Sequence, residues 1–105
     1  MSWDYYLGHP DQPALIKEAD LISKLEDLFT VSEVQVDNDG WVHSFTATEK
    51  GKMEDWEFTR QDEGYFWANC TMNGDWIEEL WEICQKIVTR LGWQINDPQS
   101  GDQWL

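Results

Sequence analysis

Basic residues are scarce in this 105-residue chain. Lysine and arginine together number 7, against 21 aspartates and glutamates, which gives a net charge of -14 at pH 7. Proteins that bind nucleic acids need a basic surface to neutralise phosphates, and anionic membranes attract basic segments. The charge balance therefore excludes a general nucleic-acid-binding protein and argues against docking on a membrane surface.

Long apolar runs and cysteines are also scarce. A membrane-spanning helix needs about 20 apolar residues, whereas the apolar runs here are short, as at 65–68. Residues 1–7 include Asp4 and no basic residue, so they lack the pattern of a secretory signal peptide. We therefore expect a cytoplasmic protein, or one translated inside a host cell. In that setting Cys70 and Cys84 are expected to be buried thiols rather than a disulfide.

Patterns of catalytic and metal-binding residues are missing from the sequence. The two histidines, His9 and His43, lie in a proline-rich loop and in a predicted strand, and no His-x-x-x-His or Cys-x-x-Cys spacing is present. No Gly-x-Ser-x-Gly turn marks a serine nucleophile. The acidic segment 37–40 lacks the later ligands of a calcium loop. We therefore expect no enzyme activity, no cofactor and no metal site.

Helix and strand patterns, by contrast, are clear. Apolar residues spaced three and four apart predict helices over 14–29 and 76–91. The second helix has Asp75 as its expected N-cap, with Glu78 completing a capping box, and Gly92 as its expected C-terminal residue. Short alternating segments separated by turns predict strands, and the last residues are expected to form a tail. The predicted strands are 3–7, 31–36, 41–48, 53–60, 65–72 and 93–95, and the tail is 102–105.

This order of elements predicts a single α+β domain over residues 1–105. Consecutive short strands joined by tight turns favour an antiparallel sheet, here of four to six strands. The two amphipathic helices would pack on one face of that sheet. Its other face would then meet solvent or a partner.

Acids and tryptophans are interleaved along the predicted hairpins and at the start of the second helix. The 8 tryptophans exceed what a core of this size needs, so we expect some at the surface, with Trp67 and Trp81 in the core. Charges speed encounter and select a partner, and tryptophans supply much of the binding energy of an interface. The predicted partner-binding residues are Asp37, Asp39, Trp41, Glu54, Asp55, Trp56, Asp62, Glu63 and Trp76.

The segment 91–101 reads Leu-Gly-Trp-Gln-Ile-Asn-Asp-Pro-Gln-Ser-Gly. It resembles the closing part of small immunity proteins of bacterial polymorphic toxin systems, where an amphipathic helix leads into a short strand and an Asp-Pro-Gln turn. The resemblance implies a small, acidic, cytoplasmic α+β protein that neutralises a toxin by direct binding. The expected partner is therefore a basic protein, such as a nuclease toxin, and the resemblance assigns no functional residue.

Two alternatives remain open from the sequence. The same charge suits a phage-encoded inhibitor, such as an anti-CRISPR protein, whose carboxylates mimic the phosphates of DNA. An enzyme or a small-ligand-binding domain would instead use the open face of the sheet around Trp41, His43 and Tyr65. The oligomeric state is also open, because surplus tryptophans can form a dimer face.

Overall fold

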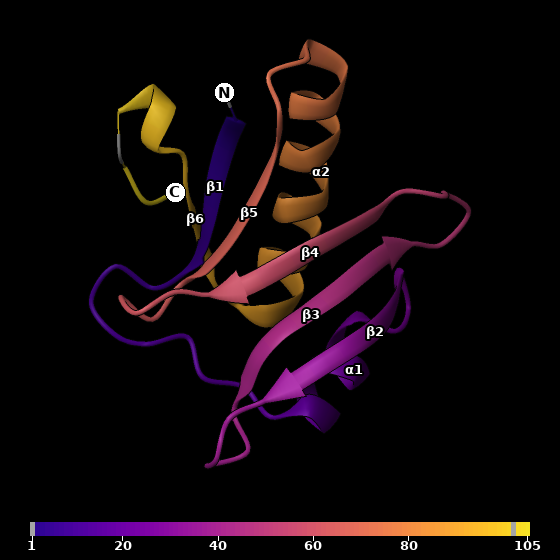
Figure 1. Cartoon of the computed structure of the whole chain (residues 1–105), viewed down its shortest axis with the longest axis vertical. Coiled ribbons are helices and arrows are strands. Elements are labelled where there is room, and N and C mark those ends of the chain that lie inside the picture. Colours follow the sequence, from indigo (N-terminus) through magenta and orange to yellow (C-terminus); the bar gives the residue numbers. More distant parts are fainter. Residues whose placement is uncertain (1, 102) are drawn as a thin grey trace.

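In the computed structural model, which describes residues 2–101 and 103–105, six antiparallel strands form one sheet with two helices on one of its faces (Figure 1). The α+β fold predicted from the sequence is confirmed. The elements in chain order are β1 (Ser2–Gly8), α1 (Glu18–Leu25), β2 (Phe29–Val36), β3 (Val42–Glu49), β4 (Asp55–Arg60), β5 (Phe66–Thr71), α2 (Gly74–Leu91), β6 (Gln94–Asn96) and the 3-10 turn η1 (Pro98–Ser100).

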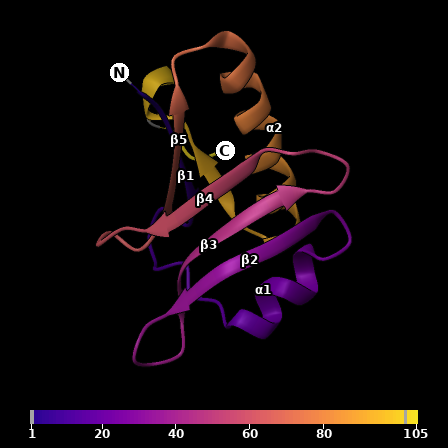
Figure 2. The same ribbon diagram turned by 45° about the vertical axis from the view of Figure 1, so that its right-hand side comes forward.

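The strand order in the sheet is β2-β3-β4-β5-β1-β6, so a four-stranded meander is extended by the first and the last strand. Strand alternation decides which side chains face the helices. Phe45 of β3 pairs with Phe58 of β4, and Ala47 pairs with Trp56; all four are buried. The polar residues between them face the opposite side, which Figure 2 shows free of helices.

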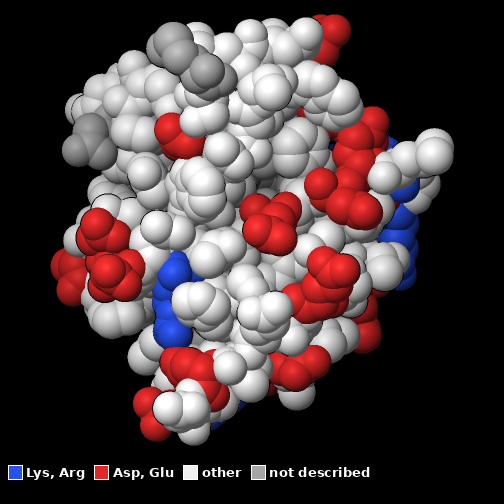
Figure 3. All heavy atoms as spheres, in the orientation of Figure 1, with Lys and Arg blue, Asp and Glu red and all other residues white. Residues whose placement is uncertain are grey.

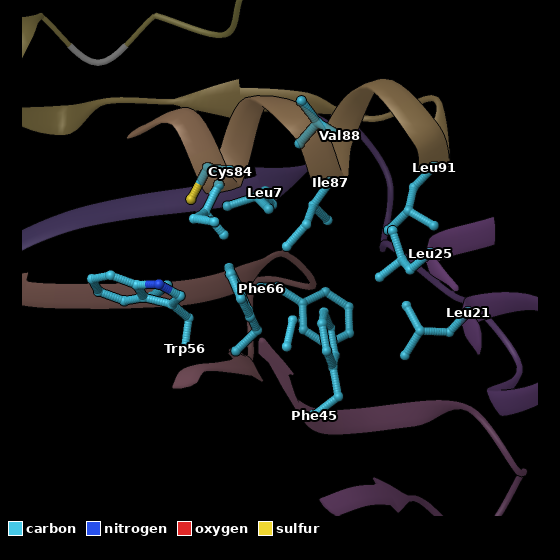
Figure 4. Packing of buried hydrophobic residues seen from close by; sticks show 14 of the residues in the cluster. Leu7, Leu21, Leu25, Phe45, Trp56, Phe66, Cys84, Ile87, Val88 and Leu91 are labelled. Carbon is cyan, nitrogen blue, oxygen red and sulfur yellow. The ribbon is translucent and has the colours of Figure 1, made fainter. Parts of the chain in front are cut away.

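The core lies between the sheet and the two helices. α2 packs on β1, β5 and β6, while α1 packs on β2 and meets α2. Figure 4 shows this meeting point, where Leu91 of α2 lies close to Leu25 of α1. Both cysteines are free thiols, and Cys84 is fully buried in this core. Within the described ranges no helix is long and apolar enough to cross a membrane.

Trp67 and Trp81 were expected in the core, and only Trp81 packs against it. Trp81 of α2 is half-buried and packs against the core, with its ring centroid 5.3 Å from that of Tyr5. Trp67 lies on the open face of the sheet, because the buried residues Phe66 and Ala68 flank it in β5. Its Nε1 donates to the Asp4 carboxylate at 3.0 Å, so the core prediction for Trp67 is wrong.

The first helix is shorter than the predicted range 14–29. Before it the chain is extended: the Val42 N–H donates to the carbonyl of Ile16 at 2.9 Å. Ala14 and Ile16 are buried while Leu15 between them is exposed, which is the alternation of an extended segment. The apolar residues at this end of the predicted helix therefore belong to an extended segment whose backbone bonds to the start of β3.

α2 begins at a different cap from the one predicted. Asn73 is the N-cap, and its Oδ1 accepts hydrogen bonds from the N–H groups of Asp75 (3.0 Å) and Trp76 (3.4 Å). These contacts satisfy two of the N–H groups that a helix start leaves free. The predicted cap at Asp75 and its capping box with Glu78 are therefore wrong. At the other end Gly92 has a φ of 71°, the left-handed conformation expected of it.

The C-terminal segment closes one edge of the sheet. The Gln99 side chain accepts from the N–H of Asp4 at 2.7 Å and donates to its carbonyl at 2.8 Å, as a neighbouring strand would. The predicted tail also returns to the sheet, since Leu105 exchanges two backbone hydrogen bonds with Ile95. Asp102, within that predicted tail, lies outside the described residues. The Asp-Pro-Gln turn thus has a structural role.

Candidate functional site

β4 and β5 are paired at one end only. Thr59 pairs with Trp67 and Arg60 with Phe66, and within the described residues the ladder stops there. β4 continues to pair with β3 as far as Asp55, so its own strand conformation persists. The two strands therefore diverge from each other, as Figure 1 shows, and the start of α2 lies beside the open end.

A cavity of about 400 Å³ lies where the two strands diverge. Its lining comes from the start of β4, the end of β5 and the first turn of α2. The lining residues are Glu54, Asp55, Trp56, Cys70, Thr71 and Trp76. The rings of Trp56 and Trp76 meet edge to face, with centroids 5.9 Å apart and an interplanar angle of 71°.

The aromatic wall of this cavity is partly fixed and partly exposed. Trp56 is only 8% exposed because it points into the core beside Ala47, whereas Trp76 is 38% exposed. Met53 and Met72 are each adjacent in sequence to a lining residue, and they are 93% and 51% exposed. Large apolar side chains exposed around one cavity are typical of an interaction site.

The carboxylates of the cavity have no basic partner. None of the ion pairs among the described residues includes Glu54 or Asp55. The Asp55 carboxylate accepts a hydrogen bond from the hydroxyl of Thr48. Two acids that have no ion-pair partner among the described residues therefore line the cavity together with the tryptophan pair.

The predicted residues of the β2–β3 turn are instead used within the fold. Asp37 accepts from Arg60 Nη2 at 2.7 Å and from the N–H groups of Asp39 (2.9 Å) and Trp41 (3.0 Å). The guanidinium of Arg60 is the main cause that holds the pKa of the Asp37 carboxyl below its usual value. Asp37 therefore organises its turn and joins it to β4.

Trp41 is covered by a cation of the same chain. Lys17 Nζ lies 4.1 Å from the centroid of the Trp41 ring, and it donates to the carbonyl oxygen of Asp39 at 2.7 Å. A cation over an indole face is a favourable contact. This indole therefore already has a cation bound to it within the fold.

The remaining predicted residues, Asp62 and Glu63, lie in the turn that follows β4, at the other end of this strand from the first cavity. Asp62 lines a second cavity, of about 360 Å³, together with His43 and with Arg60, which is paired with Asp37. Glu63 is exposed in the same turn. Of the residues named for a ligand site on the open face, only His43 lines this cavity.

The structure thus brings together four of the nine predicted partner-binding residues, Glu54, Asp55, Trp56 and Trp76. Sequence reasoning missed Cys70 and Thr71, which line the same cavity. Nothing in the local pattern of β5 indicates that its end separates from β4. The exposed methionines that border the cavity were an available signal, since methionine is frequent at adaptable binding surfaces.

The thiol of the cavity is not activated. Burial raises the pKa of the Cys70 thiol, so it stays protonated and is a weak nucleophile. Across the part of the chain that the structure describes, no group of three or more His, Cys, Asp or Glu residues is placed to hold a metal ion.

No protein-family model, curated protein or solved structure matches the chain.

Proposed function

We propose that this chain is a non-enzymatic inhibitor that binds a basic protein, as the immunity proteins resembled by its last segment do. The cavity between β4 and β5 would be the centre of the interface. One observation carries this proposal: Glu54 and Asp55, which have no ion-pair partner among the described residues, line the same cavity as the exposed Trp76. Aromatic anchors within a polar rim are the usual composition of a specific protein interface.

The electrostatics of the wider surface supports the same partner. Figure 3 shows carboxylates spread over the face seen in Figure 1, whereas the basic groups are few and lie toward its sides. A field of one sign raises the rate at which an oppositely charged protein is encountered, and it rejects partners of like charge. A basic protein would therefore be both attracted and selected.

The open face of the sheet would extend the interface beyond the cavity. Hydroxyl side chains and acids form rows across β2, β3 and β4 on this face, although Thr46 among them is buried and donates to Glu33. One row is Thr30, Thr48 and Asp55, and the next is Ser32, Thr46 and Glu57. Hydroxyls and carboxylates together can accept several hydrogen bonds from lysine and arginine side chains.

Parallel affinity columns test the proposal. One column carries the native chain, the second carries Glu54→Lys/Asp55→Lys, and the third carries Asp11→Lys/Glu26→Lys. The third variant changes the net charge equally at exposed acids that lie outside the cavity. Lysate of the organism that encodes the chain is passed over each column, and bound proteins are eluted by a salt ramp.

The expected result is one basic protein that elutes at high salt from the native and Asp11/Glu26 columns but not from the Glu54/Asp55 column. The purified protein should bind the native chain and lose its activity on binding. Calorimetry should show affinity weakened by about tenfold or more for the Glu54/Asp55 variant. Equal retention on all columns would contradict the proposal, and a nucleoprotein complex displaced by DNA would identify a DNA mimic instead.

A further inference from the structure

We infer that the cavity between β4 and β5 is a pocket for a single arginine side chain of the partner. This inference rests on the proposed function, since it names the group that the same site selects. It is carried by the aromatic walls of the cavity, by its acceptor groups and by the absence of any cation of this chain from its lining.

The walls suit a flat cation. A guanidinium group is planar and weakly hydrated, so it stacks on indole rings better than an ammonium group does. Trp76 offers an exposed ring, and Trp56 is held in place by the core behind it. The methylene groups of an arginine side chain could pack on the apolar surface of the exposed Trp76 ring.

The acceptors also match a guanidinium, which has five N–H donors and no acceptor. Glu54 and Asp55 supply carboxylates, the partners with which arginine forms paired hydrogen bonds. Beyond Thr59 and Trp67 the facing edges of β4 and β5 no longer pair with each other. The backbone of the two strands at the cavity is therefore not used in pairing β4 with β5.

The chain contains a similar arrangement that is already filled. At the β2–β3 turn, Lys17 lies over the ring of Trp41 and donates to the carbonyl of Asp39. At the cavity the basic residue nearest in sequence, Lys52, pairs with Glu49 (3.5 Å) and Glu79 (3.4 Å) instead. The described lining of the cavity contains no lysine or arginine, so the cation that we infer for it comes from another molecule.

The test is a nuclear magnetic resonance titration of the full chain with Nα-acetylarginine methylamide. The indole N–H signals of Trp56 and Trp76 are followed, each assigned by a Trp→Phe substitution. A single side chain should bind with a Kd of about millimolar order. The citrulline analogue has nearly the same shape but no charge. Its affinity should be lower by a factor of about ten or more. The lysine analogue should also be weaker.

Variants locate the response in the cavity. Trp76→Ala and, separately, Glu54→Gln/Asp55→Asn should abolish the saturable shift of the Trp56 signal. Trp41→Ala is the matched control, because it removes an indole that is covered by Lys17, and it should leave the shift unchanged. The amide variant keeps the test valid if Trp76→Ala fails to fold, since Glu54 is half-buried and Asp55 is exposed.

An equal response to the citrulline analogue, or no saturable shift at Trp56 and Trp76, would overturn the arginine pocket. The arginine pocket and the proposed function can fail independently of each other. Capture of a basic protein that depends on Glu54 and Asp55 would uphold the proposed function without the arginine pocket. Arginine binding by a chain that captures no basic protein would uphold the pocket and remove the proposed function.

Discussion

Glu49 is an acid that this fold uses for its own stability. It lies at the end of β3, where Lys86 of α2 donates to its Oε2 and Lys52 Nζ lies 3.5 Å from its Oε1. Its side chain is only 12% exposed. The hydrogen bond from Lys86 is the main cause that holds the pKa of Glu49 below the usual 4.5. The charged carboxylate thus joins the sheet to the helix above it.

Glu49→Gln should lower the free energy of unfolding at pH 7 by about 1 to 2 kcal/mol, because it removes the charged hydrogen bond to Lys86. A carboxyl whose pKa is depressed in the fold stabilises it above pH 4.5, and that contribution is lost as the pH falls through the folded-state pKa. Urea unfolding of both proteins at pH 7 and at about pH 3 should therefore show the difference shrinking with acid.

The control for this prediction is Glu26→Gln, which changes an exposed acid with no ion-pair partner among the described residues. The carboxyls of Asp27 and Asp37 also have lowered pKa values, because of Arg90 and Arg60, but they titrate equally in both proteins. A difference between Glu49→Gln and the native chain that persists undiminished in acid would contradict the role given to Lys86.

At the scale of the element, the start of α2 connects stability to the candidate site. Asn73→Ala should lower the free energy of unfolding by about 1 kcal/mol, because the helix start loses its side-chain acceptor. Asp75→Ala should cost only a few tenths, about the value of an acid in the first helical turn. Trp76 is one of the residues whose N–H the cap holds, so its indole signal should also shift in Asn73→Ala.

Asn73→Asp is the matched control, since aspartate caps a helix about as well as asparagine does. Urea unfolding of the three variants gives the comparison. A larger loss in Asp75→Ala than in Asn73→Ala would support the cap that the sequence pattern favours, and it would contradict the one observed in the structure.

Some of the helices and strands could be predicted from the sequence and others could not. Turn signals separate the strands clearly, so the meander from β2 to β5 was predictable. Segment 14–17 was not, because Leu15 and Ile16 continue the three- and four-residue spacing of the helical face, whereas the buried residues are Ala14 and Ile16. Phe29 fits the predicted helical face but is the first residue of β2. The extended conformation of segment 14–17 is decided by the hydrogen bond from Val42 to Ile16, and Val42 is distant in sequence.

The candidate site was predictable in four of its six lining residues and not in its geometry. Acids next to tryptophans pointed to Glu54, Asp55 and Trp76 from the sequence. The burial of Trp56 follows from strand alternation, because Trp56 lies two residues before Phe58 and so shares its buried face. The divergence of β4 from β5 could not be predicted, because nothing in the local pattern of either strand marks where their pairing ends.

Across the whole molecule, the few basic residues serve mainly to hold elements together. Lys52 and Lys86 join the sheet to α2, Arg60 joins β4 to the β2–β3 turn, and Arg90 joins α2 to the end of α1. Pairs of this kind satisfy only some of the 21 acids. The unpaired acids repel one another, and such repulsion destabilises the compact state.

This distribution predicts that the cavity acids do not serve folding. Glu54→Gln/Asp55→Asn should be at least as stable as the native chain at low salt, with a Tm higher by up to about 5 °C, because two unpaired charges are removed from an acidic surface. Asparagine can still accept the hydrogen bond from Thr48. The gain should fade as salt rises, since the Debye length falls to about 10 Å at 0.1 M.

Thermal unfolding at low and high salt measures this gain, with Asp11→Asn/Glu26→Gln as a control of equal charge. Because the cavity acids lie next to each other, the Glu54/Asp55 variant should gain more than the control, whose two sites are far apart in the sequence. If the Glu54/Asp55 variant is more stable but no longer binds a basic partner, the two acids lower the stability of the native chain and are needed for binding. A clear loss of Tm would instead assign Glu54 and Asp55 a structural role and count against the binding site.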